Sequence, residues 1–156
     1  TLMGHMLEPW RKDKKRRLIE TAKFYLFDVG LVRAAKNMIL IQERTEEFGW
    51  AFEHFMIEEI RAYLSYNERS LPLTYWRTTT GLEVDLIIGD CELVLEFKAA
   101  GNIKSDHLKG LRAFLEENSV KQAILVCCER EPRRIGDILV LPWKDFCRRL
   151  WEHEFV

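Results

Sequence analysis

Two short apolar segments separated by a Gly-Asp pair constrain this chain most strongly. They lie in residues 82–98, "LEVDLIIGDCELVLEFK", where every second residue on one side of each segment is apolar: Leu82, Val84, Leu86 and Ile88, then Leu93, Leu95 and Phe97. Alternation with a period of two is typical of β-strands, and Gly89-Asp90 suits a tight turn. The sequence therefore predicts a β-hairpin with an apolar face on each strand.

Three charged residues stand inside this apolar pattern. Glu96 and Lys98 are two positions apart, so on a strand they point to the same face. If the strands pair through the turn, Asp85 can lie close to Glu96. Two adjacent carboxylates without a cation would force one of them to stay protonated, whereas a divalent metal relieves the clash. The pattern predicts a site in which Asp85 and Glu96 bind Mg²⁺ or Mn²⁺, and Lys98 acts on a water molecule or a phosphate.

Other interpretations of these charges remain open at this point. Glu96 and Lys98 also fit a structural ion pair, or the solvated face of an edge strand. Glu83 shares the predicted face of Asp85 and could be a spare metal ligand or a partner for Arg77.

Glu53 is a third candidate acid. It lies in a helix expected over residues 45–65, beside an apolar stripe of Phe52, Phe55, Met56, Ile60 and Tyr63. A carboxylate at the border of such a stripe can face the sheet. It can equally be a surface residue, because Glu58 and Glu59 occupy the same helix.

The rest of the chain predicts an α/β fold with helices flanking a mixed sheet. Residues 5–27 contain two strand-like pieces, and Asp28 can cap a short helix over 29–36. After the helix at 45–65 we expect strands at 73–80, 82–88 and 92–98, a helix from Ser105 to about 118, strands at 122–128 and 137–142, and a final helix after Pro142. Short links make the first three strands a meander, and the helix that follows them indicates a parallel crossover.

Composition limits the class of protein. The chain has 156 residues, 47% hydrophobic and 31% charged, which suits one globular domain with a real core. No apolar run is long enough for a membrane span, and no signal peptide is visible, so we expect a cytoplasmic location. The cysteines then fit free buried thiols: Cys91, Cys127, Cys128 and Cys147. The first residues begin in mid-pattern, which predicts a fragment of a longer protein.

The net charge of −1 argues against a generally basic nucleic-acid-binding protein, but the charge is uneven. Residues 11–17, "RKDKKRR", carry six basic residues and one acid. This run is either a solvated hairpin or a patch that contacts phosphates. The candidate phosphate contacts are Arg11, Lys14, Lys15, Arg16 and Arg17.

The pattern of acids and lysine resembles that of the PD-(D/E)XK nuclease superfamily: Glu53 on a helix, Asp85 on one strand and Glu96-x-Lys98 on the next. The core of that superfamily has the same order of helix, three strands, helix and strand. Nearly the whole chain is similar to the C-terminal domain of unknown function of prokaryotic AAA-type ATPases, through "KFYLFDVGLV", "FGWAFEHFMIEEI", "YWRTTTGLEVDLII", "LEFKAAG", "HLKGLRAF" and "VLPWKDF". The resemblance implies a connecting, winged-helix-like region over 1–44 and a nuclease-like domain over 45–156. The ATPase module would lie upstream, because this chain has no P-loop motif.

The same resemblance implies roles for individual residues. Asp85 and Glu96 would bind the metal with the Phe97 carbonyl, Glu53 would assist through water or a second metal, and Lys98 would activate the nucleophile. Val84 replaces the proline that gives the superfamily its name. Some members carry a glutamine on the next helix, where Ser105, Asp106 and His107 are the candidates here.

The leading hypothesis is metal-dependent hydrolysis of DNA by the C-terminal domain of an ATPase. The rival is a catalytically inactive nuclease fold that docks DNA or a protein partner for that ATPase. A third hypothesis is an oligomerisation domain, and self-association is compatible with all three.

Overall fold

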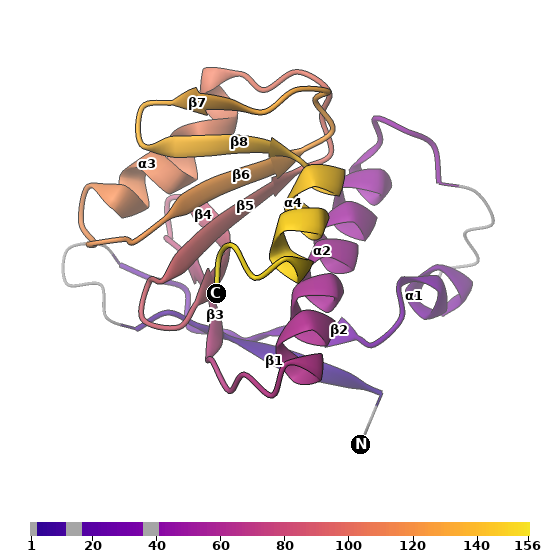
Figure 1. The fold of residues 1–156 in the computed structure, drawn as a ribbon. Helices are drawn as coiled ribbons and strands as arrows, with labels where there is room; N and C mark the ends of the chain where they lie inside the picture. Colours follow the sequence, from indigo (N-terminus) through magenta and orange to yellow (C-terminus); the bar gives the residue numbers. More distant parts are fainter. Residues whose placement is uncertain (1–2, 12–16, 36–40) are drawn as a thin grey trace.

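The computed structural model describes residues 3–11, 17–35 and 41–156, which form a mixed α/β fold (Figure 1). Eight strands make one sheet in the order β2-β1-β3-β4-β5-β6-β8-β7. The strands are β1 (Gly4–Pro9), β2 (Lys23–Leu26), β3 (Leu73–Arg77), β4 (Glu83–Ile88), β5 (Leu93–Lys98), β6 (Ala123–Cys127), β7 (Arg133–Ile135) and β8 (Ile138–Pro142). The helices are α1 (Val29–Ala35), α2 (Glu46–Tyr66), the 3₁₀ helix η1 (Ser105–Leu108), α3 (Lys109–Leu115) and α4 (Trp143–Trp151).

Helices cover both faces of the sheet. Helices α2 and α4 pack on one face, where Met56, Ile60 and Phe146 join strand residues such as Leu95. Helix α3 packs on the other face, where Phe114 contacts the buried Trp76 edge to face. In the described ranges no helix is both long and apolar enough to span a bilayer.

The predicted order of elements from residue 45 onward is largely confirmed. β3, β4 and β5 form an antiparallel meander, and η1 and α3 carry the chain to β6, which is parallel to β5. Two details were wrong. Ser105 is the first residue of η1 and its hydroxyl caps no helix, since Lys104 is the cap residue. Phe55 belongs to the predicted apolar stripe of α2, but it is 39% exposed and packs against Trp143 at the surface instead of in the core. The short edge strand β7 was not predicted.

The strands before residue 44 extend the same sheet. β1 pairs antiparallel with β2 and parallel with β3, so β2 lies at the edge beside α2. Asp28 caps α1 as predicted, because its Oδ1 accepts from the backbone N–H of Gly30 at 2.5 Å. A domain boundary near residue 44 stays a prediction.

An irregularity in β4 determines where Asp85 lies. Thr74 and Trp76 of β3, two residues apart, pair with Ile87 and Val84, three residues apart, so β4 carries one extra residue. The predicted alternation through β4 was therefore wrong: Val84 packs on the α3 face, whereas Leu86 packs on the α2 face. Asp85 stands between them, at the irregularity.

Close packing of α3 fixes the start of β4. A Cβ atom on Gly110 would lie 1.7 Å from the carbonyl oxygen of Glu83, so only glycine allows the helix to approach the strand this closely. This contact fixes the backbone two residues before Asp85.

Candidate active site

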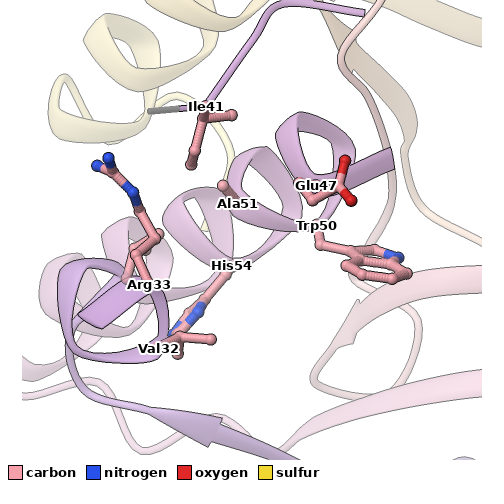
Figure 2. Close-up of a pocket in the computed structure, with 8 residues that line it drawn as sticks. Val32, Arg33, Ile41, Glu47, Trp50, Ala51 and His54 are labelled. Carbon is pink, nitrogen blue, oxygen red and sulfur yellow. The ribbon is translucent and has the colours of Figure 1, made fainter. Parts of the chain in front are cut away.

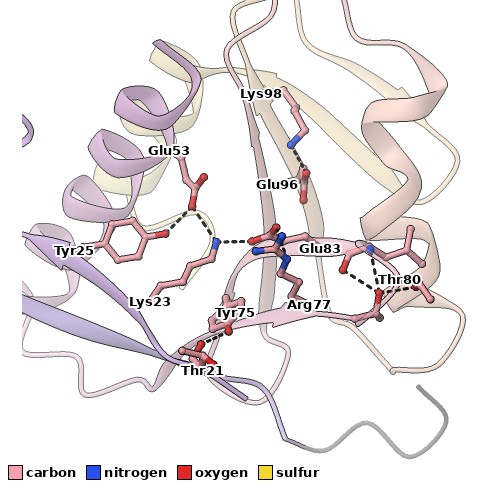
Figure 3. Close-up of polar contacts among 12 residues, drawn as sticks. Thr21, Lys23, Tyr25, Glu53, Tyr75, Arg77, Thr80, Glu83, Glu96 and Lys98 are labelled. Atoms are coloured by element: carbon pink, nitrogen blue, oxygen red, sulfur yellow. Dashed lines mark hydrogen bonds and ion pairs between the residues drawn. The ribbon is translucent and has the colours of Figure 1, made fainter. Parts of the chain in front are cut away.

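Asp85, Glu96 and Lys98 form what we call the inner cluster. Asp85 and Glu96 are 5% and 4% exposed, and they are among the few buried charged side chains in the described residues. The Lys98 Nζ lies 2.5 Å from Glu96 Oε1 (Figure 3). The sequence prediction that Asp85, Glu96 and Lys98 come together is thus matched by the geometry, although the two acids are buried and do not line an open cleft.

Asp85 lies where β4 and β5 stop pairing. Their register runs from Ile88↔Leu93 to Leu86↔Leu95, and beyond it the Phe97 N–H donates to Asp85 Oδ2 at 2.8 Å. The carboxylate therefore takes the place of a backbone partner. Because a strand residue directs its N–H and C=O to the same edge, the Phe97 carbonyl faces this opening too.

Burial raises the pKa of both acids. The pKa of Asp85 is raised to about 7, first by burial and then by the charge of Glu53, against the lowering effect of Lys98, Lys23 and the Phe97 N–H. The pKa of Glu96 is raised well above its ordinary value by burial and by Asp85. Near neutral pH the pair therefore holds a proton that an added cation would displace.

Lys98 is positively charged in this arrangement. Burial lowers its pKa, but the carboxylates of Glu96 and Asp85 outweigh burial and raise the pKa above its ordinary value. An ammonium donates protons and attracts anions, so Lys98 can stabilise a phosphate. It becomes a base only if Glu96 is engaged by another cation.

Glu53 belongs to a second group, the outer cluster, with Lys23 and Glu83. Lys23 Nζ lies 3.2 Å from Glu53 Oε1 and 2.5 Å from Glu83 Oε1. The Tyr25 hydroxyl donates to Glu53 Oε1 at 2.6 Å, and Arg77 Nε lies 3.6 Å from Glu83 Oε2. Figure 3 shows Glu53 of α2 directed toward Lys23, with Glu83 on the other side of the ammonium.

Sequence reasoning missed Lys23 and Tyr25. They alternate on β2, which places both on the face toward α2, but no local pattern pairs β2 with a helix that starts 20 residues later. Tyr25 has a raised pKa because burial and the charge of Glu53 both disfavour the phenolate. The Glu83–Arg77 contact was anticipated as an alternative.

A hollow of about 700 Å³ opens over the outer cluster, and its wall includes Lys23, Glu53, Arg77 and Glu83. Its size suits a nucleotide-sized group. A smaller pocket of about 70 Å³ lies between α1 and α2, lined mainly by apolar atoms of side chains such as Val32, Ile41 and Trp50 (Figure 2).

The inner cluster suits a hard divalent cation in its donor chemistry. It offers two carboxylates, and Glu96 Oε2 is buried without a hydrogen-bond partner among the described residues. Within that part of the chain, no three His, Cys, Asp or Glu side chains are grouped to hold a metal. Mg²⁺ and Mn²⁺ often use only one or two protein carboxylates and complete their shell with carbonyl, water and phosphate oxygens.

The candidates on the helix after Lys98 differ in their surroundings. Ser105 Oγ accepts from Arg112 at 2.8 Å, and Asp106 pairs with Lys109 at 2.8 Å. His107 has a pKa lowered by burial and by the charge of Lys98, so it is the candidate that lies within electrostatic reach of the inner cluster.

The basic run is only partly described. Arg11 and Arg17 are exposed, and Arg11 lies 3.9 Å from Glu8. Lys14, Lys15 and Arg16 fall outside the described residues. Phosphate binding by this run stays a prediction.

Comparison with protein-family models assigns the chain to a family. Residues 48–146 match the model described as "Domain of unknown function (DUF4143)", which is more than half of the chain. The chain belongs to the DUF4143 family. The matched segment contains Glu53, Asp85, Glu96 and Lys98, but it does not contain Lys23 or Tyr25.

Two curated relatives are uncharacterized proteins of Mycobacterium bovis and Mycobacterium tuberculosis. Each is 33% identical to this chain over 89 residues, which is 56% of the chain and 19% of the relative. The aligned part thus spans about a fifth of the length of these relatives. No solved structure matches the chain significantly.

Proposed function

We propose that this chain is a metal-dependent hydrolase domain that cleaves phosphodiester bonds in DNA, with Mg²⁺ or Mn²⁺ as its cofactor. The inner cluster carries this proposal. A structural ion pair needs one acid and one base, whereas this cluster has a second carboxylate of similar burial and an acceptor oxygen without a partner among the described residues. Buried groups of this kind are costly in a stable fold, so they indicate a site that is completed by a ligand.

The residues of the inner cluster have separate roles in this proposal. Asp85 and Glu96 would hold the cation together with the Phe97 carbonyl, and the bound cation would supply Lewis-acid activation of a phosphate and a water. Lys98 supplies a positive charge for the phosphate and holds a proton beside the reacting oxygens. The hollow over Lys23 and Arg77 offers room for the neighbouring nucleotide.

Two finer assignments belong to the same proposal. The order of helix, antiparallel meander, helix and parallel strand supports membership of the PD-(D/E)XK superfamily. We also propose that the domain is the C-terminal part of a prokaryotic AAA-type ATPase. The support from the relatives is their length. The aligned part is 19% of each relative, so most of each protein lies outside it.

One observation favours a second candidate, an inert nuclease fold that docks DNA or a protein. The short Lys98–Glu96 contact occupies one carboxylate oxygen of Glu96. In an inert domain this ion pair would persist, and Glu96 would not be free to bind a cation. An inert domain would bind its partner equally well after the charges of the inner cluster are removed.

The test is cleavage of end-labelled single- and double-stranded DNA with Mg²⁺ or Mn²⁺. Asp85→Asn keeps an acceptor for the Phe97 N–H, and Lys98→Met keeps the aliphatic stem. Each is expected to reduce cleavage by at least about a hundredfold. Glu152→Gln, an exposed acid that pairs with Arg148 on α4, is the matched control and should cut like wild type. Absence of cutting, or equal cutting by all variants, would refute the hydrolase.

A further inference from the structure

Lys23 occupies a position that resembles that of a bound cation. Its ammonium bridges an acid from α2 and an acid from β4, at 3.2 Å from Glu53 Oε1 and 2.5 Å from Glu83 Oε1. The side chain is 23% exposed, and the Tyr75 ring lies 5.0 Å from Nζ. The ring face adds a further favourable contact for a positive charge.

The charges around Lys23 balance only while its ammonium is present. Among the described residues, Lys23 contacts Glu53 and Glu83, and Arg77 contacts Glu83, so these contacts join two cations and two carboxylates. The charge of Asp85 also acts on Lys23. Arg77 contacts Glu83 at 3.6 Å and is 47% exposed, so it contributes less. Without Lys23, the two carboxylates would keep only the guanidinium of Arg77, which is half exposed and contacts Glu83 alone, and such an arrangement attracts a divalent cation.

We propose that Lys23 is a permanent internal cation of the site, and that its ammonium takes the place between Glu53 and Glu83 that a second divalent cation would otherwise occupy. The inference rests on the proposed function for the first cation, which belongs to the inner cluster. Lys23 is then a positioning residue that acts through Glu53 and Glu83. The β1–β2 hairpin, which lies outside the family match, supplies part of the site.

Calorimetric titration of Mn²⁺ into the whole chain tests this role. Lys23→Met keeps the length of the side chain and removes its charge, so this variant is expected to bind one more equivalent of Mn²⁺ than wild type. Lys23→Arg keeps the charge and should bind the same number as wild type. Arg77→Met is the matched control, because it removes a charge from the same hollow but leaves the Lys23 ammonium in place.

An unchanged number of equivalents in Lys23→Met, or the same gain in Arg77→Met, would overturn the proposal. If Lys23→Met is poorly folded without metal, Mn²⁺ should raise its melting temperature more than that of wild type, and an equal or smaller rise would again overturn it. A wild type that neither binds Mn²⁺ nor cuts DNA refutes the proposed function. A gain of binding in Lys23→Met would still support the role of Lys23, so the two failures are distinguishable.

Discussion

The inner and outer clusters both combine acids with lysine, but they differ in burial and in how many partners each acid has. In the outer cluster, Glu53 has both the Lys23 ammonium and the Tyr25 hydroxyl as partners, and its side chain is 22% exposed. In the inner cluster, the side chain of Glu96 is 6% exposed, shares one lysine with Asp85, and keeps one oxygen without a partner among the described residues. Both acids of the outer cluster therefore have charged partners among the described residues, although the charge of Glu53 also reaches Asp85, whereas the inner cluster has two buried acids for one lysine.

This difference separates structural from functional roles within one site. Paired charges that are partly exposed, such as Lys23, Glu53 and Glu83, contribute less to stability than buried pairs and change it less when one partner is replaced. Buried carboxylates such as Asp85 and Glu96 have raised pKa values, chiefly because of burial, and they lower the stability of the fold near neutral pH. A protein gains from such an arrangement when a ligand supplies the missing charge.

The largest expected effect is the loss of the inner lysine. Lys98→Met should lower the free energy of unfolding by about 2–3 kcal/mol at pH 7.5, because it leaves two buried carboxylates without their cation. Lys23→Met should cost only about 1 kcal/mol, since Glu53 keeps the Tyr25 hydroxyl and Glu83 keeps Arg77. Urea denaturation in the presence of a chelator measures both.

The pH dependence checks the cause of this effect. At pH 5 the loss in Lys98→Met should shrink, because Asp85 and Glu96 become protonated and need no partner. Equal losses in the two lysine variants, or a loss in Lys98→Met that does not change with pH, would remove the distinction between the clusters.

A smaller effect of opposite sign is expected when the charge of Asp85 is removed. The folded-state pKa of Asp85, about 7, lies above its ordinary value of 3.8, so the stability of wild type should fall as pH rises from 5 to 8, by on the order of 2 kcal/mol. Asp85→Asn should show a smaller fall, because only the raised pKa of Glu96 remains to contribute, and it should be the more stable protein at pH 8. Thermal unfolding at the two pH values measures the crossover.

Glu83→Gln is the counterpart from the outer cluster. It removes an acid that contacts both Lys23 and Arg77, so it should lower stability at pH 8. If Asp85→Asn also lowers stability at pH 8, the account of the inner cluster is wrong.

Much of the fold could be predicted from local patterns. Alternation identified β4 and β5, the apolar stripe identified α2, and the helix after Lys98 identified the parallel crossover to β6. The extra residue in β4 could not be predicted, because a bulge is set by how two strands pair and leaves no local signal. It changed which face Val84 occupies, and it placed Asp85 at the opening between β4 and β5.

The candidate site was predicted in part for the same reason. Asp85, Glu96 and Lys98 lie on neighbouring strands joined by a short turn, so their proximity follows from the hairpin. Lys23 and Tyr25 reach the site through pairing of β1 with β3, two strands that lie more than 60 residues apart in the chain. A contact of that range depends on the tertiary fold. Sequence reasoning therefore predicted Glu53 as a third candidate acid without its partners Lys23 and Tyr25.

The most direct test of the central claim is a Mn²⁺ titration of wild type and Glu96→Gln, followed by calorimetry at pH 7.5. The substitution removes the charge of Glu96, whose Oε2 has no hydrogen-bond partner in the described part of the chain, and it keeps the shape of the side chain. If the inner cluster is a cation site, wild type binds Mn²⁺ and Glu96→Gln binds it at least about tenfold more weakly. Equal affinity in the two proteins, or no binding by wild type, would contradict the account.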